Sequence, residues 1–117
     1  MSAGDRHPAG ASRRLDQWLW FARLVKTRSL ATRLCTAGAV SLNRAAVRKP
    51  NQMVRIGDIV VAPQGAFQRT VRVLALGARR GPASEARLLY EEIAAPVRLA
   101  DLAPAWEPLL SEEGSEE

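Results

Sequence analysis

The chain has 117 residues, of which 47% are hydrophobic and 25% are charged, and its formal net charge is +5. These values fit one folded domain with a modest core and no membrane segment, since no apolar run approaches the roughly 20 residues that span a bilayer. A single cysteine excludes an internal disulfide, and one cysteine with one histidine cannot form a Cys/His metal site, so we expect no metal, no cofactor and a cytoplasmic location.

The composition changes along the chain and predicts four segments. Residues 1–12 are small and polar, and we expect a disordered tail there. Residues 13–76 are expected to form the folded domain. Residues 77–110 are expected to form an extension that packs on this domain, and residues 111–117 form an acidic tail that we expect to be disordered.

The first helix is predicted to begin near Leu15 and to extend to Lys26, because cations suit a helix C-terminus. Apolar residues recur at helical spacing on one face: Leu15, Trp18, Leu19 and Ala22. Trp18 and Phe21 lie on or near this face and are expected in the core. Trp20 points elsewhere, and two roles stay open for it: packing against later strands, or stacking on a nucleic-acid base.

A second helix is predicted after Thr27 or Ser29, either of which is a good N-cap. Its buried face is expected to hold Leu30, Ala31, Leu34 and Cys35. Gly38 suits the left-handed position that ends a helix. Cys35 is interpreted as a small core residue and not as a nucleophile, because no histidine lies nearby to activate it.

The start of this second helix is basic. Lys26 and Arg28 flank it and no acid is present in this stretch, although helix N-termini favour acids. Backbone N–H groups at a helix start, together with two cations, can bind a phosphate, and Arg33 extends such a site by one turn. A solvated basic face is the alternative, but phosphate binding is favoured because it explains the missing acids.

Short alternating segments follow and predict a sheet. Strands are expected at residues 40–42, around residue 47, and at residues 53–56, 59–61 and 69–76. Turns are expected at Asn43–Arg44 and at Gly57–Asp58, and Pro63 and Gly65 are expected to end the strand at 59–61. The predicted fold class is α+β, with two short N-terminal helices packed on a small, curled, mostly antiparallel sheet.

The last third of the chain is predicted to be an irregular C-terminal extension, because prolines interrupt it. Ser84 is expected to cap a brief helical turn that reaches Leu88 or Leu89. The apolar residues expected to anchor the remainder are Leu99, Leu102, Trp106, Leu109 and Leu110.

Charge is sorted along the chain. Residues 13–55 hold ten Lys or Arg and one acid, whereas residues 81–117 hold two arginines and nine acids. Such sorting indicates an oriented cationic surface, which is typical of a nucleic-acid binder; chance clustering is the alternative. No paired carboxylates, Cys/His dyad or phosphate-binding glycine loop is present, so we expect no enzymatic activity.

Several spaced motifs between residues 14 and 75 resemble a known domain. They are Arg14-Leu15-Asp16, Lys26-Thr27-Arg28-Ser29, Ala31, Arg33, Gly38-Ala39-Val40, Leu42-Asn43, Lys49-Pro50 and Ile56-Gly57-Asp58. Together they resemble the RNA-binding domain named after small-subunit ribosomal protein four, also called the alpha-L motif. The resemblance implies that the second helix and the following hairpin lie against the backbone of structured RNA. The RNA-binding residues would be Arg14, Lys26, Arg28, Arg33, Asn43, Arg48 and Lys49, with Arg44 as an added phosphate contact.

A narrower resemblance involves three further motifs. Trp18-Leu19-Trp20, Arg79-Arg80-Gly81-Pro82-Ala83 and Leu89-Tyr90-Glu91-Glu92 are similar to the bacterial fifteen-kilodalton heat-shock protein family. The resemblance implies a non-enzymatic RNA-binding protein that binds large ribosomal subunits carrying a nascent chain, for ribosome recycling under stress. Large-subunit ribosomal RNA is the expected partner, with tRNA and DNA as further ones, and a monomer is expected. The alternative is a general RNA- or DNA-binding module or regulator without ribosome specificity.

The chain departs from this family's pattern in two places. Asn43 is followed by Arg44 where the domain usually has glycine, and we expect a longer or differently shaped turn because arginine rarely adopts a positive φ. Long members of the family carry a basic helical extension, whereas this chain has the acidic segment 111–117. That segment is a candidate to fold over the basic face and weaken nonspecific binding.

Overall fold

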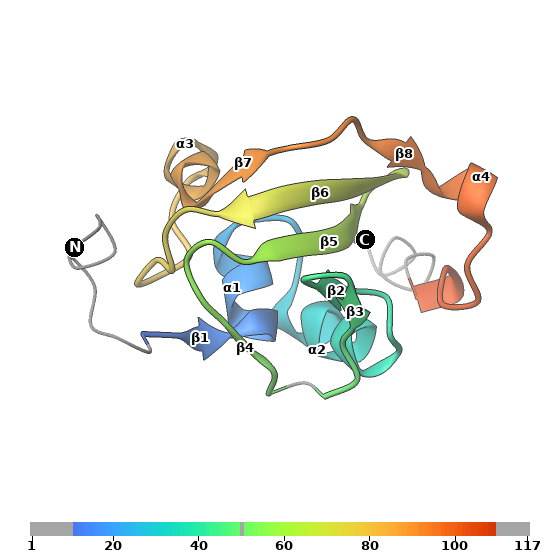
Figure 1. Cartoon of the computed structure of the whole chain (residues 1–117), viewed down its shortest axis with the longest axis horizontal. Helices are drawn as coiled ribbons and strands as arrows, with labels where there is room; N and C mark the ends of the chain where they lie inside the picture. Colours follow the sequence, from blue (N-terminus) through green and yellow to red (C-terminus); the bar gives the residue numbers. More distant parts are fainter. Residues whose placement is uncertain (1–10, 50, 110–117) are drawn as a thin grey trace.

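The computed structural model describes residues 11–49 and 51–109. The tails expected at residues 1–12 and 111–117 lie outside these ranges, except for residues 11 and 12. The fold is α+β, as predicted: two short helices, α1 (Leu15–Phe21) and α2 (Arg28–Thr36), pack beneath a mostly antiparallel sheet (Figure 1). No helix in the described ranges is long and apolar enough to cross a membrane.

The main sheet has six strands, and every strand pair in it is antiparallel. Its strand order is β3-β2-β5-β6-β7, and β8 pairs with the N-terminal end of β6, at Phe67 and Gln68. The strands are β2 (Ser41–Leu42), β3 (Ala45–Ala46), β5 (Ile59–Gln64), β6 (Phe67–Val73), β7 (Tyr90–Glu92) and β8 (Val97–Arg98). A separate two-stranded sheet pairs β1 (Arg13–Arg14) with β4 (Met53–Val54). β1 leads directly into α1.

The core lies between the helices and the long strands β5 and β6. Trp18 is fully buried, as predicted, and its indole N–H donates to the carbonyl of Ala75 at 2.8 Å. Phe21 is buried as well. The prediction that the first helix reaches Lys26 is wrong: α1 ends at Phe21, because Arg23 takes a left-handed φ of 59° that the helix cannot continue.

The predictions for α2 are confirmed. The Thr27 hydroxyl caps the helix by accepting the N–H of Leu30 at 3.0 Å, and Gly38 follows the helix with a φ of +79°. The predicted buried face, Leu30, Ala31, Leu34 and Cys35, is indeed buried. Burial, together with the negative charge of Asp16, raises the pKa of the Cys35 thiol to about 12, which agrees with a packing residue and not a nucleophile.

Several strand boundaries differ from the predictions. β5 does not end at Pro63 but continues to Gln64. β2 pairs only with Val60 and Val61 of β5, so on that side the described strands leave Pro63 unpaired and its missing N–H costs no ladder bond. β6 begins at Phe67 and ends at Val73, earlier at both ends than the predicted 69–76. The pairing of β1 with β4 was not predicted, because each strand has only two residues.

The segment after β6 contains more regular structure than its prolines indicate. It forms α3 (Ala83–Ala86), a 3-10 turn η2 (Arg87–Leu89), the strands β7 and β8, and α4 (Leu99–Leu102). Ser84 does not cap this helical turn but lies inside α3, whose N-cap is Pro82. Of the five expected anchors, Leu99 is buried, Trp106 and Leu109 pack partly buried against the core, Leu102 is exposed, and Leu110 lies outside the described residues.

Candidate nucleic-acid interface

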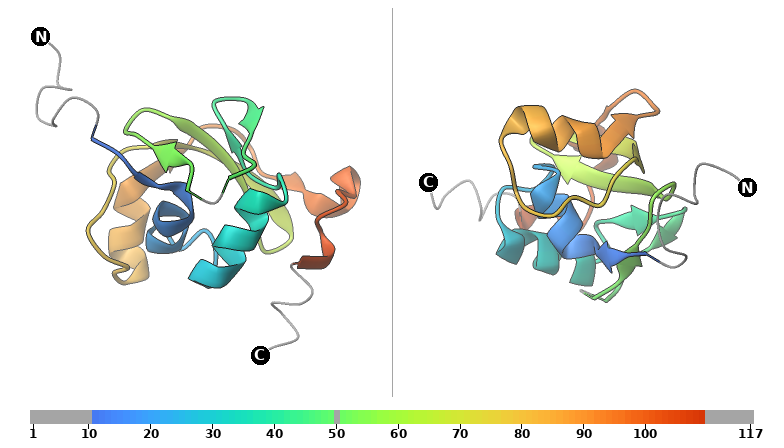
Figure 2. Two further views of the ribbon diagram at one scale, coloured as in Figure 1. Left: turned by 90° about the horizontal axis from the view of Figure 1, so that it is seen from below. Right: turned by 90° about the vertical axis from the view of Figure 1, so that its left-hand side faces the viewer.

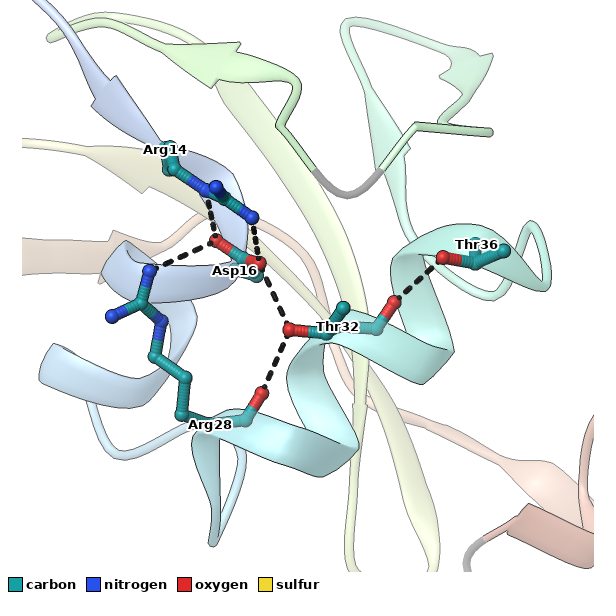
Figure 3. A network of polar contacts seen from close by, with 5 residues as sticks. All are labelled: Arg14, Asp16, Arg28, Thr32 and Thr36. Atoms are coloured by element: carbon teal, nitrogen blue, oxygen red, sulfur yellow. Dashed lines mark hydrogen bonds and ion pairs between the residues drawn. The ribbon is translucent and has the colours of Figure 1, made fainter.

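Asp16 is the centre of a polar network between α1 and α2 (Figure 3). Its carboxylate is fully buried and accepts two hydrogen bonds from Arg14, from Nε at 3.1 Å and from Nη2 at 2.8 Å. The Thr32 hydroxyl, from α2, donates to it at 2.9 Å. Arg28, the first residue of α2, lies 3.7 Å away through Nη2. One carboxylate therefore fixes two guanidinium groups whose side chains stay 42% and 41% exposed.

The network keeps Asp16 ionised. Burial alone would favour the protonated acid, but the hydrogen bonds from Arg14 and Thr32 and the positive charges of Arg14 and Arg28 outweigh it, so the pKa of Asp16 falls below its ordinary value. The hydrogen bond to Asp16 in turn raises the pKa of Arg14. The result is a fixed anion beneath two fixed cations.

This network corrects the interpretation of the start of α2. No acid lies near Arg28 in the sequence, but Asp16 of α1 lies beside it in the structure. The missing acid is therefore supplied by a neighbouring helix, and the absence of local acids is not by itself evidence for a bound phosphate. What the arrangement does provide is two guanidinium groups at the surface, Arg14 held by two hydrogen bonds to Asp16 and Arg28 drawn to the same carboxylate by an ion pair at 3.7 Å.

The turn between β2 and β3 also differs from the expectation. Leu42 pairs with Ala45, so the turn has only two residues, Asn43 and Arg44, with φ values of 52° and 75°. Both values are positive, as a type I′ turn requires. The turn is thus the short one that Asn-Gly usually makes, with arginine in the strained position.

Asn43 ties this turn to the start of β5. Its amide Nδ2 donates to Asp58 at 3.1 Å, and its Oδ1 accepts the N–H of Ile59 at 2.8 Å. The backbone N–H of Asn43 donates to the carbonyl of Ile59 at 2.8 Å. These bonds hold Arg44 at the exposed tip of the hairpin.

Arg48 lies against the C-terminal end of α2. A Cβ atom added to Gly38 would overlap Arg48 Nη1 and lie 3.0 Å from Arg48 Cζ, so the guanidinium packs directly on this glycine. Cations are favoured at a helix C-terminus. Lys49 follows, and both side chains are exposed. Lys26 is exposed before α2, and Arg33 is half-buried on it, so the predicted residues lie before, on and just beyond α2 and on the hairpin after it.

Three arginines of the second half of the chain are paired with acids. Arg69 binds Glu92 at 2.9 Å, Arg72 binds Glu91 at 2.8 Å, and Arg79 binds Glu85 at 2.9 Å. By contrast, no ion pair within residues 11–49 and 51–109 involves the following four: Arg44, Arg48, Lys49 and Arg55. Three acids of the second half thus neutralise three second-half arginines, whereas these four cations of the first half have no such partner among the described residues. We call Arg14, Lys26, Arg28, Arg33, Arg44, Arg48 and Lys49 the cationic face.

Two other arginines have structural roles that the sequence did not indicate. Arg13 donates to the carbonyls of Leu76 at 3.1 Å and Gly77 at 2.7 Å, and it packs 5.0 Å from the Phe21 ring. Arg80 donates to the Trp20 carbonyl at 2.9 Å and lies 5.4 Å from the Trp20 ring. Trp20 therefore packs against an arginine of the segment after β6, and its stacking on a nucleic-acid base stays a prediction.

Comparisons with known proteins agree with this architecture. Residues 13–60 match the S4 domain family. Heat shock protein 15 of Escherichia coli K12 is 46% identical over 84 residues, which make up 72% of this chain and 62% of that protein. The RQC P-site tRNA stabilizing factor of Helicobacter pylori J99 is 45% identical over 47 residues, or 40% of this chain and 55% of that protein. The trimeric structure of Vibrio cholerae Heat Shock Protein 15 has a TM-score of 0.67 and 39% identity, and the match covers 72% of this chain and 84% of that one.

The fold and the match of residues 13–60 define a protein built on an S4 domain, the alpha-L fold. The chain belongs to the heat shock protein 15 family. It spans less than two thirds of the length of the E. coli relative, since the match covers 62% of that protein.

Proposed function

We propose that the chain is a non-enzymatic, cytoplasmic protein that binds structured RNA through the cationic face. One observation carries the proposal: Asp16 fixes Arg14 and Arg28 in place while about two fifths of each side chain stays exposed. Guanidinium groups held in this way lose little conformational entropy when they bind a phosphate. In this proposal Asn43 positions Arg44 through its bonds to Asp58 and Ile59, and the second hydrogen of its exposed amide is a further contact offered to RNA.

The composition of the face favours recognition of backbone and shape over recognition of base sequence. It consists of arginines and lysines, which bind phosphates and fix orientation without reading sequence. Structured RNA is recognised mainly through shape and backbone contacts. Duplex DNA also presents phosphates and is the second candidate ligand. The comparison below of the affinities for duplex DNA and for ribosomal subunits distinguishes the two.

We further propose that the bound RNA belongs to the large ribosomal subunit, in a particle that still carries a nascent chain after stress. Membership of the heat shock protein 15 family supports the link to heat shock. The similarity to a protein named for stabilising P-site tRNA supports a tRNA contact on the same particle. We propose a monomer in solution; the Vibrio cholerae structure is described as trimeric, and the experiment below includes a measurement of size.

Sedimentation with ribosomal fractions tests the proposal. The chain is expected to co-migrate with free large subunits at low salt and to dissociate as salt rises, because released counterions drive phosphate binding. The double variant Lys26→Ala/Arg28→Ala should lose this association. Arg98→Ala is the matched control, because Arg98 is exposed on β8, outside the cationic face.

Two results would contradict the proposal. If the double variant binds subunits as well as the wild type does, the cationic face is not the surface that contacts the ribosome. Binding to duplex DNA and unrelated RNA with the same affinity as to subunits would leave a general nucleic-acid module. Sedimentation of the free chain in the same buffers gives its oligomeric state.

A further inference from the structure

A second basic site lies at the opposite end of α1 from Asp16. A cavity of about 320 Å³ opens there between the α1 end, the tip of the β5–β6 hairpin and α3 with η2. Besides three alanines, its lining consists of Arg23, Gln64, Arg69, Arg87 and Tyr90. Its lining begins at Ala22, six positions after Asp16, which corresponds to about 9 Å along the helix axis. Figure 1 and the left panel of Figure 2 show α3 and the β2–β3 hairpin on opposite sides of the molecule.

Arg23 occupies a backbone position that costs free energy. Its φ of 59° follows the end of α1, where glycine is the usual residue. Its Nε donates to the carbonyl of Gly81 at 2.7 Å, and its own carbonyl accepts from Gln64 at 3.1 Å. In the described part of the chain its terminal amino groups have no acid partner. An arginine kept at a strained position is an indication of function.

The acid beside Arg23 is occupied by another cation. Glu85 lies against Gly81, whose carbonyl Arg23 binds, but its carboxylate is paired with Arg79 at 2.9 Å. Burial and the nearby charge of Arg23 lower the pKa of Arg80, the residue before Gly81. Arg87, from η2, is exposed on the other side of the cavity, and no ion pair to it occurs among residues 11–49 and 51–109. Two cations from separate elements therefore border one cavity without an acid between them.

The wall beside these cations is flat and neutral. Arg69 forms a two-pronged pair with Glu92, at 2.9 and 3.0 Å, and also donates to the side chain of Gln64. Its guanidinium lies 5.8 Å from the centre of the Tyr90 ring. The pair has no net charge, and its plane is fixed. Planar guanidinium groups and aromatic rings are the surfaces on which unpaired bases stack.

We propose that this cavity binds a nucleotide, with its phosphate on Arg23 and Arg87 and its base against the wall of Arg69 and Tyr90. The volume is at the lower end of the range for small-ligand sites, which suits one nucleotide. The choice of a nucleotide over other aromatic phosphates rests on the proposed RNA-binding function. The ligand is either a free nucleotide or an unpaired nucleotide of a bound RNA, because both present the same chemistry.

Titration of the full chain with uridine 5′-monophosphate, followed by backbone amide NMR shifts, tests the proposal. Saturable shifts are expected at Arg23, Gln64 and Arg87. Uridine, which lacks the phosphate, and inorganic phosphate, which lacks the base, should each bind about tenfold more weakly or less. Equal binding of all three, or shifts confined to the cationic face, would overturn the proposal.

Two variants separate binding from folding. Arg87→Ala removes an exposed side chain, and Arg23→Gly removes the second cation while it relieves the positive φ. Each should weaken uridine monophosphate binding about tenfold and leave the chain folded, whereas Arg98→Ala should leave the affinity unchanged. Wild-type affinity in both site variants would refute the assignment.

The source of the nucleotide is decided by a single-stranded uridine pentanucleotide. Tighter binding than that of the mononucleotide, lost in Arg87→Ala, identifies an unpaired RNA nucleotide as the ligand. Equal or weaker binding identifies a free nucleotide. Failure of this assignment can be distinguished from failure of the proposed function, because Lys26→Ala/Arg28→Ala should abolish subunit binding without changing affinity for the mononucleotide.

Discussion

Arg28 Nη2 and Asp16 Oδ1 lie 3.7 Å apart, although the two residues belong to different helices. Asp16 also accepts the Thr32 hydroxyl, one turn further along α2, at 2.9 Å. The same carboxylate therefore joins α1 to α2 and sets the position of two cations on the cationic face. Folding and the proposed binding depend on one buried charge, and its replacement should affect both in measurable ways.

Asp16→Asn should destabilise the chain. The amide keeps the size of the carboxylate but loses its charge, and its NH₂ group cannot accept the hydrogen bonds from Arg14 and Thr32 that one oxygen now accepts. Loss of hydrogen bonds to a buried charged group costs about 1–3 kcal/mol, which urea unfolding would detect. Asp101→Asn is the control, since Asp101 is exposed on α4. An unchanged unfolding midpoint in Asp16→Asn would show that the network does not stabilise the fold.

The stabilisation by Asp16 should depend on pH. The pKa of Asp16 in the folded chain lies below its ordinary value of 3.8, so its contribution is fully present above 3.8 and is lost as pH falls through the folded value. The difference in unfolding free energy between wild type and Asp16→Asn should therefore shrink on acidification below pH 3.8. Urea unfolding of both proteins between pH 2.5 and 7, a range of roughly one unit or more on each side of the ordinary carboxyl values, measures it. A difference independent of pH would mean that Asp16 does not titrate as described.

The parts of the fold that rest on local pattern were predictable. Helical spacing indicated the buried face of α2, and Gly38 indicated its end, because each signal lies within one turn of its effect. The sequence offered Thr27 or Ser29 as the cap, and the structure shows that it is Thr27. The α+β class also followed from the pattern of helices and short strands. A strand was expected at residues 53–56, where β4 lies, but the two-residue β1 has no such pattern, and only its pairing with Met53 and Val54 defines it.

The site was predictable in composition but not in arrangement. Clustered arginines and lysines indicated the cationic face, whereas the role of Asp16 required the packing of α1 on α2. The first-turn position of Asp16 was visible in the sequence, but its burial and its contact with Arg28 were not. The turn at Asn43–Arg44 was also misjudged, because Asn43 donates two hydrogen bonds, to Asp58 and Ile59, and accepts one from Ile59, and these offset the strain on Arg44.

Gly38→Ala should weaken RNA binding through Arg48. The added Cβ overlaps the Arg48 guanidinium, which must move away from the end of α2. The backbone φ of +79° also disfavours alanine, so stability should fall by about 1–2 kcal/mol. Gly65→Ala is the matched control, because it has a φ of +59° and no atom within 4 Å of its added Cβ. Both variants should lose stability in urea, but only Gly38→Ala should lose affinity for ribosomal RNA in filter binding; equal affinities would exclude Arg48 from the interface.

Arg44→Gly should make the chain more stable and a weaker RNA binder. Glycine adopts the φ of 75° without the steric cost that arginine bears, which should raise the unfolding free energy by about 1 kcal/mol. Loss of one phosphate contact should lower RNA affinity and reduce the slope of log affinity against log salt by about 1. Arg44→Lys separates the two effects: it keeps a cation at the hairpin tip, so its salt slope should match the wild type while its stability shows no gain. A glycine variant that gains stability at undiminished affinity would mean that the hairpin tip does not reach the RNA, and the strain on Arg44 would then need another explanation.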